Sequence, residues 1–438
     1  MSLELVSIAI PALLVLLLTL GVPIAFATAS TGLLIGYILF GGSTFFFVPF
    51  RMYDLMNSYV LIAVPLFLFM GYMLEYGGVA HRMFRVIHIW SGHMRGGLAV
   101  GTIVAGAILA AMVGVIGAEI VALGLVALPQ MLKRGYDRRL SFGVVCAGGS
   151  LGQMIPPSVV LILYALMANV PVRDLFLAAL VPSGVLVALY IAYVLVRAKL
   201  DPGLAPAAPP EELAISSREK LALAKDLVLP LTIIVAVLGS LYGGIATPTE
   251  AASIGVFGAI VAAAANRQLT LASIGNALKQ TSVTIGMLMW TFFGANAMIS
   301  VYSRAGGVSY LSELINGLGF GPMQLLLMMM LILLLLGMLI DVIGILILTM
   351  PIFLPILSAA GIDLIWFGIL FSINMQVSYL TPPFGPAVFY LKAVTPPDTS
   401  LSELFRSVWP FVGLQLLALL LVLLFPQLAL WLPGVGQQ

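Results

Sequence analysis

The sequence predicts an all-α polytopic membrane protein, with about ten spanning helices plus two re-entrant hairpins in two inverted repeats. Three observations support this fold class. Of the 438 residues, 62% are apolar and only 8% are charged, whereas soluble domains carry about 25% charged residues. Many separate apolar stretches are long enough to cross a bilayer. One pattern of proline, glycine and tyrosine occurs twice at a constant spacing.

The repeated pattern centres on two double prolines, Pro156-Pro157 and Pro382-Pro383. The same offset of 226 residues relates Leu128/Leu354, Pro129/Pro355, Gly135/Gly361, Asp137/Asp363, Tyr164/Tyr390 and Pro171/Pro397. This many matches in one register indicate an internal duplication. Both copies place helix breakers inside apolar sequence, which is the sequence signal for the binding site of a secondary transporter.

Predicted spanning helices need about 20 mostly apolar residues. In chain order they are 3–20, 22–41, 57–76, 140–168, 175–197, 226–242, 247–265, 284–301, 364–392 and 400–430. The first apolar run lacks a basic segment before it and continues to Phe40. We therefore read it as two retained helices, broken near Gly21 and Pro23, and not as a cleaved signal peptide.

Two further apolar stretches, 97–132 and 322–358, are too long for a single span and are interrupted midway by small or polar residues. We predict that each forms a re-entrant hairpin, because non-helical backbone at membrane depth needs cover from protein or a water-filled cavity. Two ordinary spans joined by a tight loop remain the alternative. Residues 79–95 are apolar and basic and fit an amphipathic helix lying in the membrane interface.

The distribution of positive charge sets the predicted topology. With the N-terminus on the periplasmic side, five cytoplasmic segments hold all Lys and Arg residues except Arg51, Arg173 and Arg304, in agreement with the positive-inside rule. Each half then makes an odd number of crossings, so the second half is inverted. The predicted units are 1–200, with broken helix 140–168, and 225–438, with broken helix 364–392; residues 201–224 form a cytoplasmic linker.

The two hairpin tips and the two proline breaks are expected to meet at the centre of the membrane. Proline frees a backbone carbonyl, and freed carbonyls suit sodium, whereas half-helix N-termini suit a carboxylate. Neutral polar side chains at the breaks add oxygens and amides, although some of them will only satisfy the broken backbone: Ser150, Gln153, Ser158, Asn374, Gln376, Ser378 and Thr381.

Two carboxylates, Glu119 and Asp341, fall at the predicted tips, one in each half. Ionisable residues inside a membrane are costly and usually functional. Glu119 is therefore a candidate for binding a coupling cation, a proton or an amine of the substrate. The alternative for both residues is a structural role, in which the carboxylate caps the N-terminus of a hairpin helix.

Other function classes have little support in the sequence. Gly148-x-Ser150-x-Gly152 matches the serine hydrolase elbow, which sits on a strand–turn–helix, but here it lies in a predicted membrane helix far from the three histidines. No nucleotide-binding or HExxH motif occurs. A channel would need a polar stripe along a helix, and no helix here shows one. The single cysteine, Cys146, excludes a disulfide framework. The sequence predicts a secondary transporter and no enzyme.

The motifs at these positions resemble those of the large membrane subunit of tripartite ATP-independent periplasmic (TRAP) transporters, the DctM type. The resemblance covers nearly the whole chain, in family order: MLKRGYD (131–137), GGSLGQMIPPS (148–158), DLFLAALVP (174–182), PTEAA (248–252), GMLID (337–341) and YLTPPFG (379–385). At the first tip the chain departs from many relatives, because Gly117-Ala118-Glu119 stands where they carry Ser, Ala or Thr.

The resemblance implies an elevator-type transporter with scaffold and transport domains, in the bacterial inner membrane. It implies sodium-coupled uptake of an organic acid, such as a C4-dicarboxylate, with no cofactor other than the coupling ion. The implied partners are a small four-helix membrane subunit (DctQ type) and a periplasmic substrate-binding protein (DctP type). A stand-alone sodium/anion symporter of the divalent-anion type is the alternative, although that type carries Ser-Asn-Thr at its tips and neither tip here does.

The resemblance also assigns the substrate and ion sites to the tips and breaks. Sodium is expected near Gly117, Ser150, Asp341 and Thr381. The full set of candidate binding residues is Gly114, Gly117, Ala118, Glu119, Gly149, Ser150, Gly152, Gln153, Pro156, Pro157, Ser158, Gly337, Asp341, Asn374, Ser378, Thr381, Pro382, Pro383 and Gly385.

Overall fold

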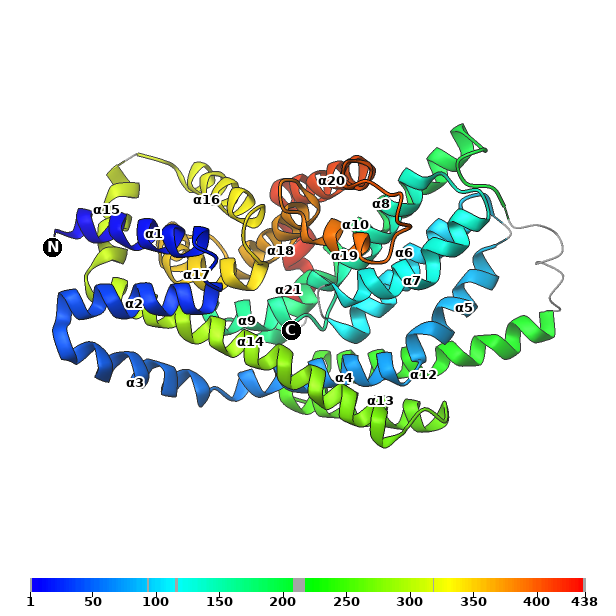
Figure 1. Cartoon of the computed structure of the whole chain (residues 1–438), viewed down its shortest axis with the longest axis horizontal. Helices are drawn as coiled ribbons and strands as arrows, with labels where there is room; N and C mark the ends of the chain where they lie inside the picture. Colours follow the sequence, from blue (N-terminus) through cyan, green and yellow to red (C-terminus); the bar gives the residue numbers. More distant parts are fainter. Residues whose placement is uncertain (1, 93, 115–116, 208–216, 318, 436–438) are drawn as a thin grey trace.

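The computed structural model describes residues 2–92, 94–114, 117–207, 217–317 and 319–435 (Figure 1). Within these ranges every regular element is a helix. Eight helical segments of the described chain are long and apolar enough to cross a membrane, and shorter apolar helices accompany them. This is the predicted class, an all-α polytopic membrane protein.

The first half of the chain contains ten α-helices in the described ranges. They are α1 (Leu3–Thr19), α2 (Ile24–Phe40), α3 (Thr44–Met56), α4 (Ala63–Tyr76), α5 (Val79–Ser91), α6 (Gly97–Val113), α7 (Ala118–Lys133), α8 (Arg138–Ser150), α9 (Val159–Ala168) and α10 (Val172–Leu200). Short 3₁₀ turns lie at Gly41–Ser43 (η1), Tyr59–Ile62 (η2) and Leu151–Gln153 (η3).

The second half follows the same plan. Its described helices are α12 (Ser217–Tyr242), α13 (Pro248–Ala265), α14 (Leu271–Arg304), α15 (Gly307–Gly317), α16 (Pro322–Gly337), α17 (Val342–Ala359), α18 (Leu364–Leu380), α19 (Pro386–Lys392), α20 (Leu401–Leu424) and α21 (Gln427–Val435).

The offset of 226 residues relates whole helices as well as the proline motifs. Arg138 begins α8 and Leu364, 226 positions later, begins α18. Lys133 ends α7 and Ala359, again 226 positions later, ends α17. The same spacing pairs the end of α5 with the end of α15. The duplication therefore extends along most of the chain, and α15 is the counterpart of the predicted interfacial helix.

Four boundaries differ from the sequence prediction. The segment after α2 forms a helix, α3, although Pro49 lies inside it. α14 is a single helix of 34 residues that begins at Leu271, where a loop was expected. α12 begins at Ser217, inside the predicted linker, and residues 208–216 of that linker lie outside the described ranges. The predicted span 400–430 is two helices, because α20 ends at Leu424 and Pro426 precedes α21.

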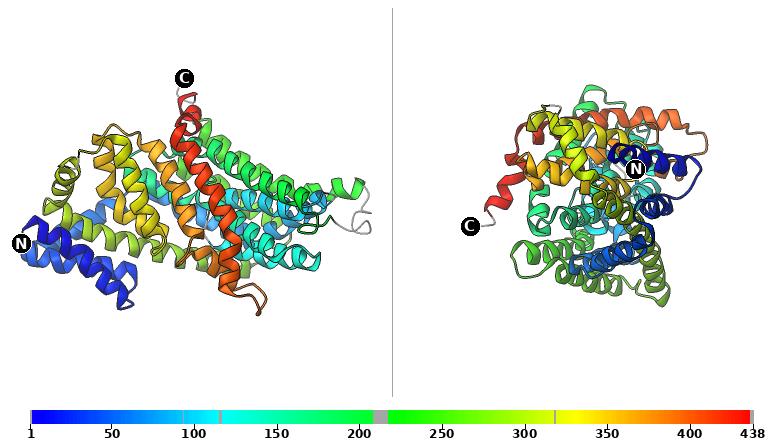
Figure 2. Two further views of the ribbon diagram at one scale, coloured as in Figure 1. Left: turned by 90° about the horizontal axis from the view of Figure 1, so that it is seen from above. Right: turned by 90° about the vertical axis from the view of Figure 1, so that its left-hand side faces the viewer.

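The helices pack in two groups (Figures 1 and 2). In the first group α14 contacts α2, α3 and α4, and α13 contacts α4 and α12. Small residues allow these helices to approach closely: a Cβ at Gly32 of α2 would lie 2.5 Å from the backbone nitrogen of Met298 in α14, as is common in membrane helix pairs. The Tyr72 and Thr284 hydroxyls, 2.9 Å apart, link α4 to α14.

The second group contains the hairpins and the broken helices. α8 contacts α6, α7 and α20, and α18 contacts α16 and α20. α5 contacts both α6 and α12, so it lies between the two groups. Large apolar side chains cover the outside of the molecule, including Phe46, Ile245 and Leu271, which are each at least 80% exposed. Exposed apolar surface of this extent is typical of a protein that faces lipid.

Candidate transport site

The two broken helices begin at matching corners. Gly135 and Gly361 have positive φ angles of 76° and 73°, a conformation that favours glycine. Two residues later an aspartate caps the next helix: Asp137 accepts a hydrogen bond from the Leu140 N–H at 2.8 Å, and Asp363 accepts one from Trp366 at 2.9 Å. These corners fix where α8 and α18 start and thus where each helix reaches its proline break.

The first break separates α8 from α9. The Ser150 hydroxyl donates to the Ala147 carbonyl at 2.9 Å, and the Ser158 hydroxyl donates to the Gln153 carbonyl at 2.8 Å. The Pro156-Pro157 peptide bond between these serines is cis. In this state both hydroxyls satisfy the broken backbone. The N-terminus of α9 has no side-chain cap, so its N–H groups are available to an anion.

The second break separates α18 from α19, with a cis bond between Pro382 and Pro383. The Thr381 hydroxyl donates to the Val377 carbonyl at 2.6 Å. Gly385 precedes α19 with a φ angle of +39°. Like the serines of the first break, Thr381 is engaged with its own helix.

Polar side chains of α18 hold α16, the first arm of hairpin 2, which consists of α16 and α17. The Asn374 amide donates to the Met330 carbonyl of α16 at 2.9 Å. The Ser378 hydroxyl lies 3.3 Å from the Leu334 carbonyl and 3.0 Å from the Asn374 carbonyl. A Cβ at Gly337 would overlap the Ser378 side chain. In this state these three predicted residues serve the contact between hairpin and broken helix.

The tip of hairpin 1, which joins α6 to α7, contacts the first break and α19. Gly114 and Gly117 have φ angles of +58° and +97°. A Cβ at Gly114 would lie 2.6 Å from the Pro157 carbonyl oxygen of the first break, and a Cβ at Gly117 would lie 2.8 Å from the Tyr390 ring of α19. The first tip therefore lies against the first break and against the helix that follows the second break.

Glu119 lies one residue after Ala118, the start of α7, and is only 2% exposed. Its carboxylate lies against Gly152, where a Cβ would overlap both oxygens. The Gly152 backbone N–H is the one hydrogen-bonding group beside the carboxylate, and no side chain of the described residues bonds either oxygen. A Cβ at Gly149 would overlap the neighbouring Ile120. Both glycines therefore let α7 approach the first break closely.

Asp341 at the tip of hairpin 2 has a different environment. Its carboxylate caps α17 by accepting the Ile343 N–H at 3.1 Å, and the residue is exposed. In this structure Asp341 therefore acts as a helix cap, which was the structural alternative considered for it. The Tyr379 hydroxyl of α18 lies within electrostatic range of both Glu119 and Asp341, so the two tips approach the same part of the broken helix.

Ser150 and Gln376 occupy equivalent positions of the two halves and contact each other directly. The Gln376 amide donates to the Ser150 carbonyl at 3.1 Å, and the Gln415 amide of α20 lies 3.5 Å from the Ser150 hydroxyl. The symmetry axis of the duplication therefore passes close to this pair. The Gln153 amide, in the same break, is buried without a hydrogen-bond partner in the described chain.

Gln415 was missed by the sequence prediction. It is fully buried within an apolar helix, and a lone amide inside the span 400–430 was the available signal. A polar residue within an apolar span usually faces the protein interior, because lipid offers it no hydrogen bond.

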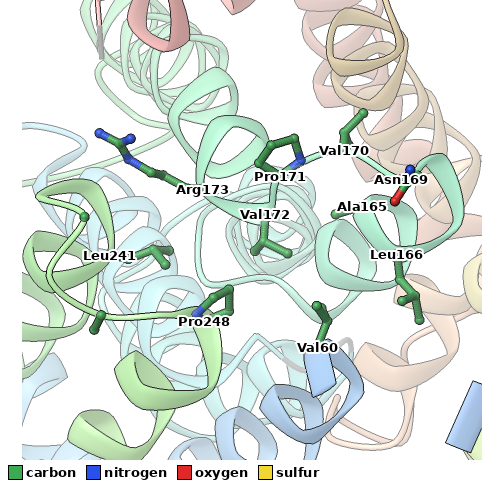
Figure 3. Close-up of a pocket in the computed structure, with 12 residues that line it drawn as sticks. Val60, Ala165, Leu166, Asn169, Val170, Pro171, Val172, Arg173, Leu241 and Pro248 are labelled. Carbon is green, nitrogen blue, oxygen red and sulfur yellow. The ribbon is translucent and has the colours of Figure 1, made fainter. Parts of the chain in front are cut away.

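A cavity of ≈ 330 Å³ lies elsewhere in the molecule (Figure 3). The Arg173 guanidinium at its edge donates to the Tyr242 carbonyl at 2.8 and 3.1 Å. Its lining contains none of the predicted site residues: Val60, Ala165, Leu166, Asn169, Val170, Pro171, Val172, Arg173, Leu241, Gly244, Ala246 and Pro248.

The comparisons with known proteins agree with this architecture. The family model described as "Tripartite ATP-independent periplasmic transporter, DctM component" matches residues 12–428. The C4-dicarboxylate TRAP transporter large permease protein of Pseudomonas aeruginosa is 33% identical, and the match covers 91% of each chain. The ectoine/5-hydroxyectoine TRAP transporter large permease protein of Ruegeria pomeroyi is 29% identical, with 85% of each chain covered.

A solved structure shares the fold at low sequence identity. The Alcanivorax borkumensis YdaH transporter, whose description reports an unusual topology, aligns with a TM-score of 0.62 and 15% identity over 86% of this chain and 85% of that chain. The family model covers nearly the whole sequence, and the relatives are named as transporter permease subunits. This chain therefore belongs to the DctM family, the large permease components of TRAP transporters, and it is a transporter subunit and not an enzyme.

Proposed function

We propose that this chain is the translocation subunit of a sodium-coupled importer of an organic acid in the bacterial inner membrane, with a periplasmic N-terminus. Membership of the family implies a tripartite system. We further propose a DctP-type periplasmic protein that delivers the substrate and a DctQ-type small four-helix subunit that binds this chain. The observation that carries the proposal is the contact of one hairpin tip with the first proline break and with α19, which follows the second break.

The coupling ion is proposed to be sodium, bound near Gly117, Ser150, Asp341 and Thr381. α8 and α18 end at the breaks, and half-helix C-termini with unwound carbonyls are the groups that coordinate sodium in transporters. Ser150 and Thr381 donate their hydroxyl protons to backbone carbonyls, which leaves the lone pairs of each hydroxyl oxygen for an ion. The carboxylate of the substrate is proposed to bind the uncapped N-terminus of α9.

The movement is proposed to be of the elevator type. The helices around α14 would form the scaffold, and the hairpins with the broken helices would form the transport domain. The division into two packing groups supports this assignment. α5 contacts both groups and its counterpart is α15, so these two helices would connect the moving part to the fixed part.

The test is uptake by the reconstituted three-component complex in proteoliposomes. Replacement of sodium by choline at fixed pH should abolish accumulation, and ATP should have no effect. Full uptake in choline would contradict sodium coupling. Omission of the binding protein should also stop uptake, whereas robust uptake by the two membrane subunits alone would favour a stand-alone sodium/anion symporter of the divalent-anion type.

A further inference from the structure

Glu119 is a buried carboxylate that lacks a counter-charge. It is 2% exposed, and the Gly152 backbone N–H is the one hydrogen-bonding group beside its oxygens in the described chain. No charged side chain among the described residues interacts with it electrostatically. A buried polar group that the protein leaves unpaired needs an explanation, and an ionised one is strongly unfavourable without a partner.

The described groups near Glu119 offer it no cation. α7 packs against α5, α6, α8 and α19. The Tyr379 hydroxyl interacts with Glu119, Asp341, Cys146 and Tyr390, and the Tyr390 ring lies against Gly117. None of these groups can supply a positive charge. An ionised Glu119 would therefore have no counter-charge among them.

The position of Glu119 in its helix offsets part of the cost of burying an ionised carboxylate. It lies in the first turn of α7, where the helix dipole stabilises negative charge. Across the same break, the uncapped N-terminus of α9 offers N–H groups. The first break therefore has two kinds of binding group. Glu119, beside Gly152, would attract a cation, and the N–H groups of α9, after Ser158, would attract an anion.

We propose that Glu119 binds a cationic group of the transported organic acid, so that the substrate class is zwitterionic: a carboxylate together with an ammonium or amidinium group. The inference rests on the proposed function, since it assumes that the substrate binds at this tip. A dicarboxylate would place its second negative charge against Glu119 and would be repelled. A sodium ion could supply the same positive charge, and the experiment separates these two sources.

The described residues of this site lie in close contact. A Cβ at Gly114, Gly117 or Gly152 would collide with the opposing break, with Tyr390 or with Glu119 itself.

The experiment measures ligand-dependent thermal stability of the purified chain with its small subunit. The probes are ectoine, which carries a carboxylate and an amidinium, and succinate, which carries two carboxylates, each in saturating sodium. Ectoine should raise the melting temperature of the native protein more than succinate does. In Glu119→Gln the ectoine affinity should fall at least about tenfold, because one partner of a buried charge pair is removed.

Two controls keep the outcome clear. Glu250→Gln changes an exposed carboxylate that caps α13 and should keep the preference for ectoine. If Glu119→Gln does not assemble, Glu119→Asp retains the charge and should keep the preference with a smaller shift. Equal or greater stabilisation by succinate, or the same response to both probes in the native protein and Glu119→Gln, would overturn the proposal.

A sodium titration without substrate identifies the source of the cation. The native protein and Glu119→Gln should show the same sodium-dependent rise in melting temperature. Loss of that rise in the variant would mean that Glu119 holds the coupling ion, and the inference about the substrate would be wrong. Absence of a sodium response in the native protein as well would count against the proposed coupling instead.

Discussion

The two hairpin tips carry the same kind of charge in opposite circumstances. Glu119 is buried and has only the Gly152 backbone N–H beside its oxygens in the described chain, whereas Asp341 is exposed and caps the helix that follows it. The residue 226 positions after Glu119 is Ile345, which is fully buried and apolar. The duplication has therefore preserved the helical frame but not the chemistry of the tips. Asp341 has a structural role in its helix, and the structure shows no such role for Glu119.

The largest expected effect is that of Glu119→Gln on transport. Uptake by the reconstituted complex should fall at least about tenfold, as expected for loss of one member of a buried charge pair. Stability should stay equal or rise, because a charge at the bilayer centre costs about 2.5–3.5 kcal/mol on insertion scales. Uptake assays and thermal melts of the same preparation test both parts. Native uptake in the variant would remove the functional difference between the tips.

The glycines of the two tips should also differ. Gly117→Ala places a methyl group in the Tyr390 ring and keeps a left-handed backbone, so it should cost about 1–3 kcal/mol. Gly344→Ala, near the start of α17, meets only the movable ends of the Ile24 and Ile340 side chains from a regular helix and should cost less. Denaturant unfolding of both variants gives the order. A larger loss for Gly344→Ala would contradict the close fit of the first tip.

Asp341→Ala should remove a helix cap and lower stability by about 1 kcal/mol. Asp341→Asn retains the capping oxygen and should be nearly neutral. Melting temperatures of the two variants separate the contribution of the capping hydrogen bond from that of the negative charge. If Asn is as damaging as Ala, then the charge of Asp341 matters and the two tips are more alike than the structure indicates.

The smallest effect is expected at a solvated charge cluster. Arg138 at the start of α8 binds Asp398 at 2.9 Å and Glu403 at 3.0 Å. The hydrogen bond that Arg138 donates to Asp398 raises the pKa of the Arg138 guanidinium, so it stays charged at all working pH values. Since Arg138 and Asp398 are well exposed, Arg138→Gln should cost under about 1 kcal/mol, and less in high salt. Melts at two salt concentrations test this. A large loss would mean that this solvated cluster contributes as much to stability as a buried charge pair.

Features that depend on local sequence were predictable. The corners at Gly135 and Gly361, the proline breaks and both hairpins follow from glycine, proline and apolar run lengths. Features that depend on packing were not. Nothing in the apolar sequence of 42–56 shows that α3 would be held against α14, and the tip of hairpin 1 contacts Tyr390, more than 270 residues away.

The candidate site was predictable in position but not in detail. The sequence places Glu119, Asp341 and the neutral polar side chains at tips and breaks. Only the structure shows that Ser158 and Thr381 bond their own backbone and that Asp341 is a cap. A hydroxyl or carboxylate near a broken helix has a local backbone group within reach in most conformations, so its partner depends on side-chain rotamers that the sequence does not specify.

The single helix α14 sets the depth at which the first group of helices sits in a bilayer. Its charged residues, Lys279 and Arg304, are 25 positions apart, which corresponds to about 37 Å along a helix. A hydrocarbon core of about 30 Å fits between them with a modest tilt. Vertical displacement in either direction would pull one of these charges into hydrocarbon. The two charged ends of α14 therefore fix its position along the membrane normal. Any movement of the hairpins can be measured relative to this fixed helix.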